Sequence, residues 1–190
     1  MPNSIFVENT PYAIGISIGI VALLAWRLKP SVFRLMAWQS FGVASALFWG
    51  VFAALIVSFG WNFYYKLFVP DWYRFTAPIG AVVLYSAIAI LFRWITLRLP
   101  GNPVIWFCML GGIESIPEHT VGIYRFHILE IPILAGSSAA SLFIFAFFEY
   151  VIYWGLVLAL AIGVERAIKV TRRSSLKEQA PSNKVNRSGT

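Results

Sequence analysis

Long apolar stretches alternate with short polar segments along most of this chain. Five of these stretches predict membrane-spanning helices, because a helix needs about 20 mainly apolar residues to cross the hydrocarbon core of a bilayer. Their predicted bounds are 12–26, 35–59, 77–97, 103–124 and 139–164. The pattern therefore predicts an all-α integral membrane protein, with residues 1–164 forming one polytopic membrane domain.

The composition supports this prediction. Hydrophobic residues make up 59% of the 190 residues and charged residues only 12%, and the mean hydropathy is +0.74. A typical soluble domain is about half apolar and a quarter charged. A soluble domain of this size could not bury so much apolar surface.

The basic residues predict the orientation of the bundle. Although the net charge is +7, these residues flank the apolar stretches or lie near the C-terminus, which does not favour a nucleic-acid partner. On the five-span topology, twelve basic residues fall on one side and three, Lys66, Arg74 and Arg125, on the other. Because basic loops stay in the cytoplasm, we expect the N-terminus outside and the C-terminus inside. The polar and basic residues 165–190 have the composition of a disordered tail.

The loop between the second and third stretches, 60–74, is rich in aromatic residues near its ends. These residues are Trp61, Tyr64, Tyr65 and Trp72. Tryptophan and tyrosine are enriched where a membrane meets water. We therefore expect them to form an interfacial belt on the outer surface.

The fourth stretch contains residues that weaken a helix at membrane depth. Gly111 and Gly112 are adjacent, and Pro117 lacks the backbone N–H that a helix interior uses. We expect a broken or kinked fourth helix, which a membrane tolerates only where protein or a water-filled cavity satisfies the freed backbone groups. The segment that follows, 123–138, fits an outer loop, an interfacial helix or a re-entrant piece.

Titratable residues gather beside this expected break. Between residues 111 and 130 lie three of the eight acidic residues and both histidines: Glu114, Glu118, His119, His127 and Glu130. A charge at membrane depth costs at least a few kcal/mol, so such residues indicate a function. Glu149, in the fifth stretch, is expected at about the depth of Glu114. With Glu118 and His119 these two acids form the predicted catalytic centre.

Each of these residues also has a structural interpretation. Ser115 and Glu118 fit a helix-capping box, and His119 could simply be hydrogen-bonded between helices. His127 and Glu130 are expected on a solvated face near the head groups. Burial favours the neutral form of a carboxyl group, so a lone acid in the membrane could rest there bonded to a tyrosine. Candidate partners are Tyr85, Tyr150 and Tyr153.

The leading functional hypothesis is a membrane-embedded enzyme that performs acid/base chemistry on an apolar lipid or isoprenoid. Isomerisation, cyclisation or hydration would suit a site reached sideways from the bilayer, with a neutral glutamic acid as general acid and a carboxylate or His119 as base. The same residues, Glu114, Glu118, His119 and Glu149, could instead hold a divalent metal ion, with His127 and Glu130 as weaker ligands.

No haem or retinal is expected. No lysine lies inside a predicted span, so a retinal Schiff base is excluded on this topology. The two histidines lie eight residues apart on one segment and cannot face each other across a haem. The cofactor, if there is one, stays unidentified apart from the possible metal ion.

Two other functions fit the same pattern. A proton- or cation-handling transporter or channel subunit would use acids at the midplane and a broken helix. A homo-oligomer or an accessory subunit of a larger membrane complex would use small-residue faces such as Gly15 with Gly19. A transporter needs polar groups between Glu114 and the cytoplasm, and 103–110 supplies none, which favours the enzyme.

Overall fold

A computed structural model describes residues 2–28, 31–55 and 65–179. The described residues contain five α-helices: α1 (Pro2–Leu28), α2 (Val32–Leu55), α3 (Asp71–Thr96), α4 (Pro103–Thr120) and α5 (Ala139–Gln179). Between them lie the short strands β1 (Lys66–Leu67) and β2 (Leu129–Glu130), a π-helical turn η2 (Val121–Arg125) and a 3₁₀ turn η3 (Pro132–Leu134). The predicted all-α fold class is confirmed.

Two of the described helices are long and apolar enough to cross a membrane. They are α3, over Ile79–Thr96, and α5, from Ala139 onward. The apolar part of α1, Pro11–Leu24, is shorter. The end of the second predicted span, 56–59, lies outside the described residues. The full set of five spans therefore stays a prediction.

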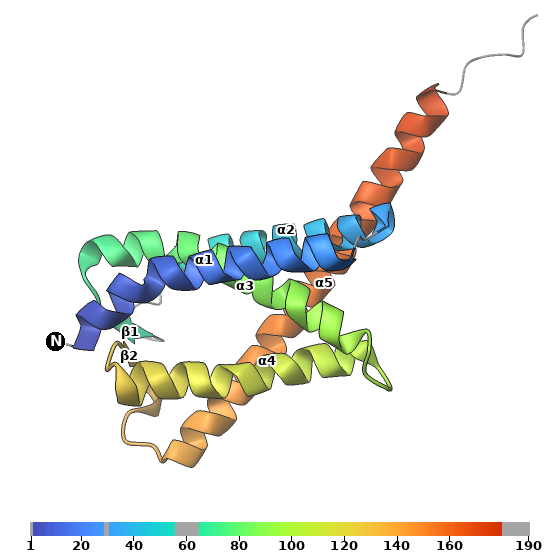
Figure 1. The fold of residues 1–190 in the computed structure, drawn as a ribbon. Coiled ribbons are helices and arrows are strands. Elements are labelled where there is room, and N and C mark those ends of the chain that lie inside the picture. Colours follow the sequence, from blue (N-terminus) through green and yellow to red (C-terminus); the bar gives the residue numbers. More distant parts are fainter. Residues whose placement is uncertain (1, 29–30, 56–64, 180–190) are drawn as a thin grey trace, which may run out of the picture.

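Successive helices run in opposite directions, so the two ends of the bundle differ in character (Figure 1). The end of α1, the start of α2, the α3–α4 turn and the end of α5 lie at one end, and these segments carry most of the basic residues. The two strands lie at the opposite end. The antiparallel order thus gathers the basic residues as the topology predicted, while the side of the membrane stays a prediction.

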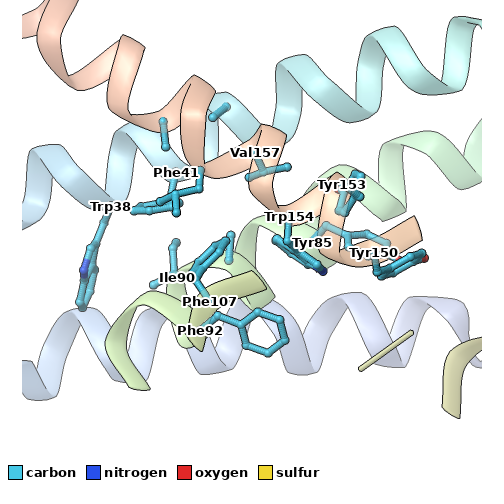
Figure 2. Packing of buried hydrophobic residues seen from close by; sticks show 14 residues of the cluster. Trp38, Phe41, Tyr85, Ile90, Phe92, Phe107, Tyr150, Tyr153, Trp154 and Val157 are labelled. Carbon is cyan, nitrogen blue, oxygen red and sulfur yellow. The ribbon is translucent and has the colours of Figure 1, made fainter. Parts of the chain in front are cut away.

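An aromatic core joins α2, α3, α4 and α5 (Figure 2). Trp154 and Phe107 are completely inaccessible to solvent. The ring centroid of Trp154 lies 5.2 Å from that of Phe92 and 5.7 Å from that of Phe107. Aromatic pairs at such distances contribute about 0.5–1.5 kcal/mol beyond their buried area. This core fills the bundle between Tyr85 and the basic end.

Gly111 and Gly112 allow α4 to approach α5 closely. A Cβ atom on Gly111 would lie 1.8 Å from Cδ1 of Trp154, and one on Gly112 would lie 2.7 Å from Cδ2 of Phe147. No side chain fits at either position without moving an aromatic ring. The predicted break at this pair is wrong, because close packing, and not flexibility, is what the glycines provide here.

The helix also continues through Pro117. The Ser115 hydroxyl donates to the carbonyl of Gly112 at 2.9 Å, and the Thr120 hydroxyl donates to the carbonyl of Ile116 at 2.6 Å. Side-chain hydroxyls of this kind occupy backbone carbonyls near a helix proline. Ser115 is therefore inside α4 and is not the N-cap of a new helix, so the predicted capping box is wrong. The departure from α geometry comes later, in η2.

The segment 123–138 is a loop that contains one short strand. It comprises the end of η2, then β2, then η3. β2 pairs antiparallel with β1, so that Lys66 lies opposite Glu130 and Leu67 opposite Leu129. Of the three predicted alternatives, an interfacial helix is excluded. The strand pairing fixes the start of segment 65–70 beside the end of α4.

The last helix is longer than predicted. α5 continues to Gln179, so the predicted disorder is wrong for residues 165–179. The helix starts from a packed membrane-length segment and therefore needs no new nucleus. An ion pair of 2.6 Å between Glu165 and Lys169, one turn apart, adds to it. Residues 180–190 lie outside the described part of the chain.

Candidate functional site

His119 is a buried histidine on the face of α4 that contacts α5, with only 2% of its surface exposed. Its Nδ1 atom lies 2.9 Å from the backbone carbonyl oxygen of Ser115. A carbonyl oxygen can only accept, so Nδ1 carries the hydrogen. Its Nε2 atom lies 3.4 Å from Oε2 of Glu149 and 3.1 Å from the hydroxyl oxygen of Tyr65. The backbone thus fixes the ring and leaves Nε2 for the neighbouring side chains.

Tyr65, His119 and Glu149 close into a triad, because the Tyr65 hydroxyl also donates to Oε1 of Glu149. Two proton arrangements with the same net charge fit these positions. In one, an imidazolium ring lies beside a carboxylate; in the other, a neutral imidazole lies beside a carboxylic acid and the hydroxyl of Tyr65 turns toward Nε2. The two differ by the transfer of one proton. The triad therefore has the geometry of a proton-exchange centre.

A second network lies beside the first. The Tyr85 hydroxyl donates to Oε1 of Glu118 and lies 3.0 Å from the hydroxyl oxygen of Tyr150. The ring of Tyr150 lies edge-on to the imidazole of His119, with 5.4 Å between centroids. Tyr85 and Tyr150 are buried, whereas Glu118 is exposed. The second network thus connects the buried interior with a carboxyl group that a ligand can reach.

Glu114 lies one helical turn before Glu118 on the same flank of α4. Its Oε2 atom is buried and has no hydrogen-bond partner among the described residues. The same is true of Nε1 of its neighbour Trp154. Glu118 and Trp154 are the side chains that Glu114 meets on this flank. Glu114 is therefore close to the exposed carboxyl group of Glu118.

The structure brings four predicted site residues together and leaves two apart. His119 and Glu149 are in direct contact, Glu118 joins them through two tyrosines, and Glu114 lies beside Glu118. Glu130 instead forms an ion pair with Lys66, with 3.3 Å between Oε2 and Nζ. His127 is exposed, in a left-handed backbone conformation with φ of 52°. Both lie beyond η2, in the segment that carries β2.

The arrangement does not favour the metal alternative. Within residues 2–28, 31–55 and 65–179, no three His, Cys, Asp or Glu side chains are grouped as metal ligands would be. Two of the candidate carboxyl groups receive tyrosine hydroxyls instead, Glu149 from Tyr65 and Glu118 from Tyr85. A site of hydrogen-bonded acids suits proton transfer better than cation binding.

Tyr65 is the site residue that sequence reasoning missed. Its position among other aromatic residues indicated a place in the interfacial belt, yet its hydroxyl contacts both His119 and Glu149. The pairing of β1 with β2 holds the neighbouring Lys66 opposite Glu130 and so brings Tyr65 to His119, at the end of α4, and to Glu149, ten residues after the start of α5. No local signal near residue 65 points to this long-range pairing.

Comparison with known proteins identifies no relative: no protein-family model, no curated protein and no solved structure matches this chain. The chemistry of the site is therefore inferred from its own geometry.

Proposed function

We propose that this protein is a multi-pass membrane enzyme that performs acid/base chemistry on an apolar lipid or isoprenoid substrate. The observation that carries the proposal is the contact of 3.4 Å between Nε2 of His119 and Oε2 of Glu149, with Tyr65 bonded to both. In this topology all five helices span the bilayer, the N-terminus is outside, and the C-terminus is cytoplasmic. The centre then lies in the outer half of the membrane.

The carboxyl groups on the flank of α4 would meet the substrate. Glu118 is exposed and Glu114 is half-buried, whereas His119 is buried behind them. In an isomerisation, a glutamic acid gives a proton to one carbon of a double bond, and a carboxylate removes a proton from the carbon attached to the other end of that bond. The bond shifts, and no proton is consumed. Glu114 and Glu118 lie one turn apart on α4, so the proton that one acid gains can return to the other, and the Tyr65–His119–Glu149 triad would provide a second proton donor and acceptor beside them.

The interior beyond the site supports an enzyme over a transporter. A transporter needs a polar route from Glu114 to the basic end. That part of the bundle is filled by the aromatic core, where Trp154, Phe107 and Val157 have no exposed surface. Protons can be exchanged at the centre, but the packed core offers them no path onward.

Deuterium incorporation tests this proposal even though the substrate is unidentified. The protein would be reconstituted with an extract of membrane lipids and isoprenoids in heavy water, and the extract would then be analysed by high-resolution mass spectrometry. An acid/base catalyst leaves deuterium on carbon in its substrate or product. General acid–base groups contribute about 100- to 10,000-fold, so we expect Glu149→Gln and His119→Gln to lower incorporation at least about 100-fold.

Glu165→Gln provides the matched control. It makes the same change on the same helix, sixteen residues nearer the basic end, where Glu165 pairs with Lys169. Wild-type rates in this variant with loss in Glu149→Gln would support the proposal. Absence of deuterium from every lipid class with folded wild-type protein would overturn it. Full deuterium incorporation in Glu149→Gln would overturn the role proposed for the triad.

A further inference from the structure

The end of α5 extends well beyond the bundle. Ala161 is the last buried residue of this helix in the described chain, and the helix continues to Gln179. Eighteen further residues of α-helix rise about 27 Å. Figure 1 shows this part projecting away from the other helices. Most side chains between residues 162 and 176 are exposed and therefore available to something outside the bundle.

The two sides of this projection continue two different faces of α5. At about 100° per residue, Arg166 and Arg173 lie within about 60° of Ile152. Ile152 is 64% exposed and points away from the bundle. Arg172 lies eighteen residues after Trp154 and hence at the same angle as this fully buried ring. Arg172 thus lies about 160° from Ile152, whereas the adjacent Arg173 lies only about 60° from it.

The outward face becomes basic where the apolar part of the helix ends. Arg166, Lys169 and Arg173, which we call the basic stripe, are all exposed, and so is the interleaved Val170 at 64%. Glu165 offsets part of this charge through its ion pair with Lys169. No ion pair in the described part of the chain involves Arg166 or Arg173. Among the described residues, Arg166 and Arg173 thus remain as unpaired cations on the face that is apolar around Ile152.

We propose that the basic stripe binds the anionic head groups of the phospholipids that surround α5. A phospholipid presents its acyl chains and its head group on the same side of a helix. Exposed apolar residues of α5, such as Phe148 and Ile152, face outward below the stripe and would contact the acyl chains. The arginines directly above them would reach the phosphates, with their alkyl stems along the apolar zone and their charges in the head-group layer.

Lipid selectivity tests this proposal. The full chain would be reconstituted in phosphatidylcholine vesicles that contain a trace of spin-labelled phosphatidylglycerol or spin-labelled phosphatidylcholine. The immobilised fraction of each label gives their relative association with the protein. We expect a preference for phosphatidylglycerol that falls about fivefold for each of Arg166→Gln and Arg173→Gln, the effect of one basic residue near an anionic surface. Added salt should weaken the preference.

Arg172→Gln is the matched control, because it removes the same charge at the next position on the other face. Unchanged selectivity in this variant, with loss in Arg173→Gln, would support the basic stripe. An equal loss in both would assign the effect to net charge and overturn the proposal. The proposal would also be overturned if the wild-type protein showed no preference for phosphatidylglycerol, including the case in which the basic stripe binds an oligonucleotide instead. This inference requires that α5 crosses the membrane, but it does not depend on the catalytic proposal. Deuterium incorporation should therefore be unchanged in these variants.

Discussion

Nε2 of His119 lies 3.4 Å from Oε2 of Glu149, and these two residues come from different helices. The carbonyl oxygen of Ser115 holds the other ring nitrogen as a donor. The imidazole can therefore exchange a proton only through Nε2, toward Glu149 or Tyr65. The fixed tautomer leaves Nε2 as the nitrogen that can exchange a proton, and this distinguishes His119 from a histidine that only fills space between helices.

Two variants of Glu149 separate its chemical role from its structural role. Glu149→Gln keeps a side chain that can accept from Tyr65, so we expect the free energy of unfolding to fall by less than about 1 kcal/mol. Glu149→Ala leaves Tyr65 and His119 without that partner and should cost about 1–3 kcal/mol. Both should lose deuterium incorporation. Thermal unfolding in detergent measures the first effect, and a glutamine variant as unstable as the alanine variant would contradict it.

Tyr85 should contribute to stability through its hydroxyl group. Tyr85→Phe leaves the carboxyl of Glu118 and the hydroxyl of Tyr150 without this partner, so we expect a loss of about 1–3 kcal/mol. Tyr124→Phe removes the same atom from a residue that is 52% exposed and should change stability by less than about 0.5 kcal/mol. Equal unfolding temperatures for the two variants would show that the buried network does not stabilise the fold.

Gly111→Ala should be strongly destabilising because its new Cβ atom would meet Trp154 at 1.8 Å. Overpacking of this kind typically costs about 1–3 kcal/mol, and more where a ring must move. Gly163→Ala meets nothing within 4 Å and should be neutral or stabilising by up to about 1 kcal/mol. Replacing Trp154 by leucine should partly rescue Gly111→Ala. If it does not, the contact between α4 and α5 is not the cause.

Single cysteines test the proposed orientation. In a Cys108→Ser background, which removes the one native cysteine, Ser137→Cys should react with a membrane-impermeant thiol reagent on intact cells. Ser174→Cys should react only after the membrane is opened. Both positions are exposed and flank the membrane-length part of α5. Labelling of Ser174→Cys alone would reverse the orientation, and labelling of both would show that α5 does not cross.

The helices could be predicted because each is marked by its own residues. The turn between α3 and α4 shows how local the signal is, since Asn102 caps α4 by accepting from the amide of Val104 at 2.9 Å, with Pro103 in the first turn. The break predicted at Gly111 and Gly112 was wrong because the role of these glycines is not local. Their role depends on Trp154 and Phe147, some forty residues away, and helix propensity alone contains no information about such partners.

The site could be predicted in part for the same physical reason. Glu149 and His119 are polar residues within apolar stretches, and burial in a membrane brings such residues together wherever helices meet. Tyr65 could not be found in this way, because tyrosine beside lysine is ordinary at a membrane surface. Its place in the triad depends on the pairing of two-residue strands, which are too short to leave a periodic pattern.

The unbroken course of α5 has a mechanical consequence. Glu149 and Arg173 lie 24 residues apart on one rod, which corresponds to about 36 Å. With its site end held in place, a change of about 5° in the tilt of such a rod moves the far end by about 3 Å. Conversely, a force on the projecting end tilts the helix and so disturbs the packing of side chains around Glu149. On the proposed topology, the length of this one helix would make the geometry of the triad sensitive to the thickness and surface of the membrane.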